Sequence, residues 1–192
     1  MKRAFLVHCW GGKPSGGWYS WIQKELLKKG FEVNLLSMPD TDIPRIDSWV
    51  NALYNAVGQL DEETYFIGHS VGCQAILRYL EKQDNKAGGV FLVAGCLHLM
   101  NLENQEAERI ISPWLTTKID LSKVRSRAKE FVAIISDSDP WVPLSDTDIF
   151  SRELGAKVII EKNRGHYTED DGVTAGANIP VLLKEILRVA NL

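Results

Sequence analysis

Short apolar runs alternate along this chain with segments whose apolar side chains recur at every third or fourth position. The period of three to four residues predicts amphipathic helices, as in Ile46, Trp49, Val50, Leu53 and Val57. The apolar runs are short and end at glycine, proline or polar residues, which is typical of strands. Strands are predicted at 3–8, 31–38, 64–69, 88–96, 130–137 and 156–162, and helices at 18–30, 45–60, 71–80 and 179–190.

Repeated alternation of strand and helix predicts a parallel sheet covered by helices on both faces. The run "GGVFLVAGC" at 88–96 is apolar throughout, as expected for a strand buried on both sides. The sequence therefore predicts an α/β fold, a three-layer doubly wound sandwich of about six mostly parallel strands in one domain spanning 1–192. Residues 97–129 are too many for a plain connection. They are predicted to form a small cap over the C-terminal edge of the sheet, where an active site is expected in this kind of fold, with one helix near 103–111.

Composition narrows the classes of protein that this chain can be. The sequence has 192 residues, 45% hydrophobic and 24% charged, which suits one folded core. A net charge of −3 argues against a nucleic-acid partner. No stretch is long enough to insert in a membrane, and the run Ala4 to Val7 is too short for a secretory leader. Cys9, Cys73 and Cys96 have neither disulfide nor zinc spacing, so a cytoplasmic protein without a metal is expected.

The stretch "TYFIGHSVGCQAILRYL" at 64–80 joins a predicted strand directly to a predicted helix. At the joint, Gly68-His69-Ser70-Val71-Gly72 matches the G-x-S-x-G pattern in which a serine on a tight turn serves as nucleophile. Glycines on both sides permit the close approach of strand and helix. In the alternative interpretation Ser70 only caps the helix.

A serine nucleophile needs a base and an orienting carboxylate, which follow it in the order acid, then histidine, in this kind of fold. His166 comes just after the last predicted strand, whereas His8 and His98 lie in other loops and His69 is expected to have a structural role. For the acid, Asp139 is favoured over Asp137, since Pro140 biases it towards an extended backbone. Asp146 and Asp148 are expected to be surface charges.

Backbone N–H groups are expected to stabilise the oxyanion. The candidates are Val71, directly after the serine, and Trp10, in the loop after the first strand. The glycines of that loop fit neither the G-x-G-x-x-G nor the phosphate-loop pattern, so no nucleotide cofactor is expected. Trp10, Leu97, Trp114 and Trp141 are predicted to contact the substrate, with Leu99 and Met100 nearby. Cys9 and Cys73 are expected to be small packing residues.

With these motifs the chain resembles the α/β-hydrolases, and in particular the small retinoblastoma-binding-protein-type, YdeN-like serine hydrolases. The resemblance covers nearly the whole chain and is carried by "WYSWIQKELLKKGFEV", "MPD", "GHSVGCQAILRYLE", "DSDPWVP" and "GHYTEDDG". It implies Ser70, Asp139 and His166 as nucleophile, acid and base. His8-Cys9-Trp10 stands where many relatives carry His-Gly, and no Leu-x-Cys-x-Glu element is present.

The function expected from the sequence is hydrolysis of small carboxylic esters, or of amides or thioesters, through an acyl-enzyme on Ser70. Two alternatives stay open: an acyltransferase that uses the same three residues, and a binding protein that keeps the fold without the chemistry.

Overall fold

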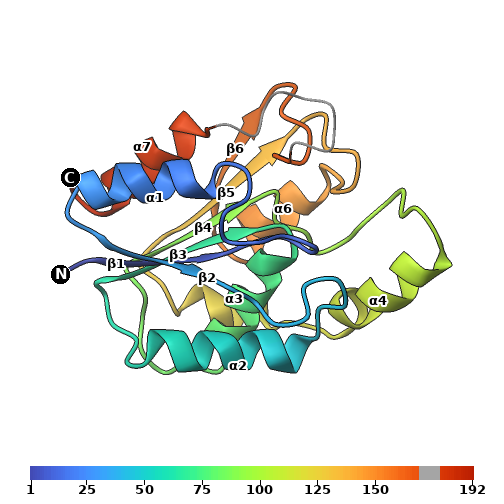
Figure 1. Cartoon of the computed structure of the whole chain (residues 1–192), viewed down its shortest axis with the longest axis horizontal. Helices are drawn as coiled ribbons and strands as arrows, with labels where there is room; N and C mark the ends of the chain where they lie inside the picture. Colours follow the sequence, from blue (N-terminus) through green and yellow to red (C-terminus); the bar gives the residue numbers. More distant parts are fainter. Residues whose placement is uncertain (169–177) are drawn as a thin grey trace.

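The computed structural model describes residues 1–168 and 178–192, and its centre is a parallel sheet of six strands. Every neighbouring pair of strands is parallel, and the order is β2-β1-β3-β4-β5-β6. The predicted doubly wound α/β fold is thus confirmed (Figure 1). The strands are β1 (Arg3–Val7), β2 (Glu32–Leu36), β3 (Thr64–His69), β4 (Gly89–Val93), β5 (Phe131–Ser136) and β6 (Lys157–Glu161).

Helices cover both faces of the sheet because successive strand residues point to opposite sides. In β1, Ala4 and Leu6 contact one core, which α1 (Tyr19–Lys28) and α7 (Pro180–Val189) complete. Phe5 and Val7 contact the other core, beneath α2 (Ile46–Val57), α3 (Val71–Glu81), α5 (Leu121–Arg125) and α6 (Asp146–Arg152). The two layers lie above and below the sheet in Figure 1.

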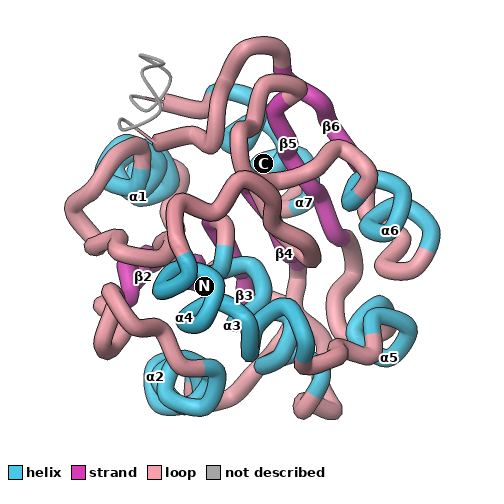
Figure 2. Tube along the Cα trace, turned by 90° about the vertical axis from the view of Figure 1, so that its right-hand side faces the viewer, coloured by secondary structure: helices cyan, strands magenta, loops and turns pink. Residues whose placement is uncertain are grey.

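The predicted excursion at 97–129 contains two helices, α4 (Gln105–Thr116) and α5. The side chain of Asn104 accepts the N–H of Ala107 at 2.9 Å, which caps the start of α4. Only Ile111 and Trp114 of α4 are buried, and the helix stands away from the body of the protein at the carboxyl ends of the strands (Figure 1). Figure 2, viewed from that side, shows α4 in front of the sheet. The predicted helix is real but begins and ends later, and α5 was not predicted.

Buried polar contacts tie this excursion to the central helix α3. Arg78 is buried, and its Nη2 donates to the carbonyl oxygens of Trp114 at 2.9 Å and Thr117 at 2.7 Å. A buried guanidinium is stable only when it is hydrogen-bonded, so these bonds fix the end of α4 against α3. In the described part of the chain, no helix is long and apolar enough to cross a membrane.

Candidate active site

Ser70 lies on a strained turn between β3 and α3. Its φ of 53° and ψ of −122° are rare for a residue with a side chain, and its N–H donates to the carbonyl of Val93 at 3.0 Å. Flanking glycines make the turn possible. A Cβ on Gly68 would lie 2.8 Å from Cys73 Cα, and one on Gly72 would lie 2.4 Å from the carbonyl oxygen of Val7. The sequence pattern therefore has a steric cause.

Gly72→Ala is expected to destabilise the protein and also to displace the turn that carries Ser70. Gly88→Ala is the matched control, because its Cβ would meet the carbonyl oxygen of Glu62 at 2.3 Å, just before β4 begins. Each clash is with backbone and should cost about 1–3 kcal/mol, measured by urea unfolding. At a temperature where both variants are folded, only Gly72→Ala should lose turnover. If the two variants had equal turnover, the position of the Ser70 turn would not matter for catalysis.

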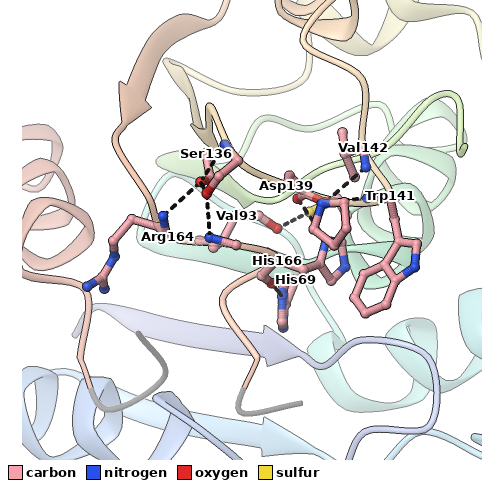
Figure 3. Close-up of polar contacts among 12 residues, drawn as sticks. His69, Val93, Ser136, Asp139, Trp141, Val142, Arg164 and His166 are labelled. Atoms are coloured by element: carbon pink, nitrogen blue, oxygen red, sulfur yellow. Dashed lines mark hydrogen bonds and ion pairs between the residues drawn. The ribbon is translucent and has the colours of Figure 1, made fainter. Parts of the chain in front are cut away.

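Asp139 and His166 form a buried pair beyond the ends of β5 and β6. The Nδ1 of His166 lies 2.8 Å from Asp139 Oδ2, and only 5% and 6% of the two residues' surfaces are exposed. Asp139 Oδ1 accepts the N–H groups of Trp141 at 2.9 Å and Val142 at 3.0 Å. Since the carboxylate only accepts, His166 carries a proton on Nδ1, and in the neutral imidazole the lone pair is on Nε2. Figure 3 shows this pair beside the indole of Trp141, whose ring centre is 5.0 Å from the imidazole's.

Three short polar side chains of the sequence "SDSD" connect the loop after β5 to the loop after β6. Ser136 Oγ accepts the N–H of Arg164 at 2.9 Å, and Ser138 Oγ accepts that of Gly165 at 3.2 Å (the Ser136 contact is drawn in Figure 3). Asp137 Oδ1 accepts the N–H of Asn163 at 2.8 Å. These bonds hold the histidine loop against the acid loop. The sequence interpretation missed them because their partners are backbone groups 26 to 28 residues away.

His69 has the structural role that was expected of it. It is 1% exposed, and its Nε2 donates to the carbonyl of His166 at 2.8 Å. On its other side, the hydroxyl of Tyr19 lies 2.6 Å from Nδ1. The residue before Ser70 therefore supports the backbone of His166 directly.

Ser70 and His166 open into the same cavity at the carboxyl ends of the strands. Its volume is about 280 Å³. Among the described residues, the lining consists of Cys9, Trp10, Gly11, Ser70, Val71, Leu99, Leu102, Glu103, Ala107, Trp141 and His166. Asp139 lies behind His166. The arrangement puts a serine hydroxyl, an imidazole held by a carboxylate, and a mostly apolar wall around one space.

Two backbone N–H groups at this cavity are available to a ligand. Val71 is the first residue of α3, where an N–H has no acceptor within the helix. The N–H of Trp10 donates to no acceptor in the described chain, while its indole Nε1 donates to the carbonyl of Asp42 at 2.9 Å. That bond fixes the ring at the cavity wall. In the described residues, no three His, Cys, Asp or Glu side chains gather in a way that suits a metal ion.

Leu97 and Trp114, two of the residues predicted to contact the substrate, are not among the described residues that line this cavity. Trp114 is 1% exposed, packs edge-on against Trp49, and donates from Nε1 to the carbonyl of Pro44 at 2.9 Å. Leu97 packs against the core and its N–H is held by Asp146. Leu102, Glu103 and Ala107 line the cavity instead. They belong to the turn before α4 and its first turn, within the segment that was predicted to cover the site, but these three residues were not singled out.

The expectation that Asp146 is a surface charge is wrong. Its surface is 0% exposed, and Oδ2 accepts the N–H groups of Leu97 at 2.7 Å and His98 at 2.9 Å. Its Oδ1 lies 2.6 Å from Nδ1 of His98, so the chain has a second His–Asp pair. The His98 side chain is 63% exposed and is absent from the described cavity lining. The last four residues of "GHYTEDDG" lie outside the described residues.

Comparisons with known proteins find relatives that match most of the chain. The family model described as serine hydrolase matches residues 4–185. YdeN of Bacillus subtilis is 29% identical over 176 residues, which cover 91% of this chain and 90% of YdeN. The crystal structure of the ydeN product has a TM-score of 0.89 at 27% identity, with all of both chains covered. The serine hydrolase RBBP9 of Rattus norvegicus is 29% identical over 159 residues, 82% of this chain and 81% of RBBP9.

A more distant structure shares the fold. Est1E of Butyrivibrio proteoclasticus, solved with ferulic acid bound, has a TM-score of 0.70 at 13% identity and covers 100% of this chain and 90% of its own.

Proposed function

The chain belongs to the serine hydrolase family, and from this premise we propose that it cleaves small carboxylic esters through an acyl-enzyme on Ser70. The observation that carries the proposal is the shared cavity: Ser70 and His166 both open into it, and a buried carboxylate holds His166 from behind. In this proposal Ser70 is the nucleophile, His166 the base and Asp139 the acid.

Each step of the reaction follows from the hydrogen bonds of the site. Nδ1 of His166 donates to Asp139, so Nε2 is the ring nitrogen that takes the proton from Ser70 Oγ as that oxygen attacks the ester carbonyl. Negative charge develops on the carbonyl oxygen, where the N–H groups of Trp10 and Val71 stabilise it. His166 then gives the proton to the departing alcohol. A water molecule, activated by the same imidazole, releases the acid and restores Ser70.

The form of the cavity supports a small, mainly apolar acyl group. Leu99 and Leu102 line the site from the segment that leads into α4, and Ala107 lines it from the first turn of that helix. The indoles of Trp10 and Trp141 add aromatic walls. The volume of about 280 Å³ is near the lower limit for a small-molecule pocket. We place this activity in the cytoplasm, where the three free cysteines stay reduced.

A fluorophosphonate probe tests the enzymatic proposal directly, because it bonds to serines that an adjacent base activates. The folded protein should be labelled once, at Ser70, and Ser70→Ala should not be labelled. Mass analysis of the labelled peptide identifies the site. No labelling of the folded protein would favour the binding-protein alternative, and labelling of Ser70→Ala would mean that another serine is the nucleophile.

Ala107→Phe is expected to shorten the acyl chains that the site accepts, because the added ring enters the cavity from the first turn of α4. With 4-nitrophenyl esters of increasing acyl length, kcat/KM for the longer chains should fall by about tenfold or more, while acetate stays less affected. Glu108→Phe, on the exposed side of the same helix, is the control. An equal loss of kcat/KM on all esters would mean that the acyl group does not bind beside Ala107.

A further inference from the structure

Cys9 differs from the other two cysteines in both its position and its surroundings. Cys73 and Cys96 are buried, and Cys73 Sγ donates to the carbonyl of Val93 at 3.6 Å. Cys9 is partly exposed and lines the cavity that holds Ser70. It also lines a second cavity of about 170 Å³, formed with the glycine-rich loop at 11–17, Tyr19 and Tyr167. Cys9 therefore borders both cavities.

Tyr19 links Cys9 to a buried imidazole. The Tyr19 hydroxyl lies 3.5 Å from Cys9 Sγ and 2.6 Å from Nδ1 of His69, and its oxygen accepts the N–H of Cys9 at 3.3 Å. Because Nε2 of His69 donates to the carbonyl of His166, Nδ1 is the nitrogen left to receive a proton. The thiol proton can pass to the Tyr19 oxygen as the Tyr19 proton passes to His69, which leaves a thiolate beside an imidazolium.

Electrostatic interactions among Cys9, Tyr19 and His69 favour the pair of Cys9 thiolate and His69 imidazolium. Burial opposes ionisation of Cys9, but the attraction of His69 and the hydrogen bonds from its neighbours outweigh it, so the pKa of Cys9 is lowered. Burial likewise opposes charge on His69, but the thiolate raises its pKa overall. Burial raises the pKa of Cys73 far above its usual value and that of Cys96 to about 12, so these two stay protonated. Among the described residues, the titratable groups that share a cavity with Cys9 or take part in its hydrogen-bond cluster are Tyr19 from α1, His69 from β3, His8 and Lys13 from its own loop, Glu103 from before α4, and His166 and Tyr167 from the loop after β6.

We propose that Cys9 is a covalent modification site for low-molecular-weight disulfides, activated through Tyr19 by His69 and opening on the cavity of Ser70. The Cys9 thiolate attacks one sulfur of the disulfide, a new S–S bond forms, and the original S–S bond breaks. The released thiolate takes the proton held by His69, so no further reactant is needed. The modification itself is independent of the proposed hydrolase function. Only its consequence, a blocked cavity and lost esterase activity, depends on that function.

The first test is the rate of reaction with 2,2′-dithiodipyridine, followed by the thione released and by the mass of the protein. One adduct per folded chain should form, at Cys9, and Cys9→Ser should form none. Each unit of lowered pKa raises the thiolate fraction tenfold and reduces its nucleophilicity about threefold, a net gain of about threefold in rate. At pH 6.5, Tyr19→Phe should therefore react more slowly, by about threefold for each unit by which the Tyr19 hydroxyl lowers the pKa of Cys9. The order should reverse at alkaline pH, where the thiol is ionised in both proteins and the thiolate of higher pKa is the better nucleophile.

The same measurements can overturn the proposal. It fails if Cys9 reacts no faster than the cysteines of the urea-unfolded chain, or if Tyr19→Phe reacts as fast as the wild-type protein. Activity gives a separate result: the adduct should abolish ester hydrolysis in the wild type, a reductant should restore it, and Cys9→Ser should keep its own activity during the treatment. A Cys9 adduct that forms at the expected rate but leaves activity intact would refute the blocked cavity alone. A protein with no esterase activity can still be scored by mass and rate.

Discussion

Ser70→Ala and His166→Ala should each lower kcat by about a millionfold, and the double variant should be little worse than either. In the proposed mechanism the hydroxyl and the imidazole act in one step, since Oγ attacks only as Nε2 removes its proton. Once one of them is missing, the other has nothing left to do. The measurement is kcat for a 4-nitrophenyl ester, with circular dichroism to confirm that each variant is folded.

The second His–Asp pair supplies the control for this result. Nδ1 of His98 lies 2.6 Å from Oδ1 of Asp146, an arrangement similar to that of His166 and Asp139, but the His98 side chain is mostly exposed to solvent. His98→Ala should therefore keep near wild-type turnover. If His98→Ala were inactive and His166→Ala active, the base would be misassigned. Losses that simply add in the double variant would contradict a concerted step.

Asp139→Asn should lower kcat by about ten-thousandfold while the fold is kept. The amide oxygen will stay at the Oδ1 position, since the N–H groups of Trp141 and Val142 both require an acceptor there. Its NH₂ group must then face Nδ1 of His166, which can accept only by giving up its proton. Nε2 becomes the protonated nitrogen and can no longer take the proton of Ser70.

Asp137→Asn is the matched change two residues earlier. Asp137 accepts the N–H of Asn163, and an amide oxygen can accept the same bond, so turnover should stay close to that of the wild type. The comparison uses kcat for one ester and thermal unfolding for both variants. If Asp139→Asn retained most of its turnover, Asp139 would not be the residue that orients the base.

The regular elements of this fold were accessible from the sequence because each has a local physical cause. Apolar runs of β3 and β4 and the three-to-four-residue period of α2 are set by neighbouring residues alone, and their predicted positions match the structure within a few residues. The short helix α5 has only five residues and no comparable period, and it was missed. The turn at Ser70 was found because it requires glycines at fixed positions, where a Cβ would clash with nearby backbone atoms.

The cavity wall and the supporting contacts could not be found in the same way. Asp146 has the local pattern of a surface residue in a helix, and only the approach of the loop after β4 makes it a buried acceptor. Cys9 fits a packing role by sequence, since nothing in its neighbourhood indicates that Tyr19 and His69 meet beside it. Trp114 was placed at the site because it lies in the right segment, but its indole turns towards Pro44.

The sequence by itself determined the order of strands and helices along the chain and the three polar residues that follow β3, β5 and β6, because hydrophobic period and glycine sterics act over short distances. Tertiary structure alone decided which side chains line the cavity, which carboxylates are buried, and which cysteine meets an imidazole. Those outcomes depend on where loops from distant parts of the chain come to rest. Hydrogen bonds to backbone groups hold these loops in place, and such bonds leave no pattern in the sequence because any residue type can supply a backbone group.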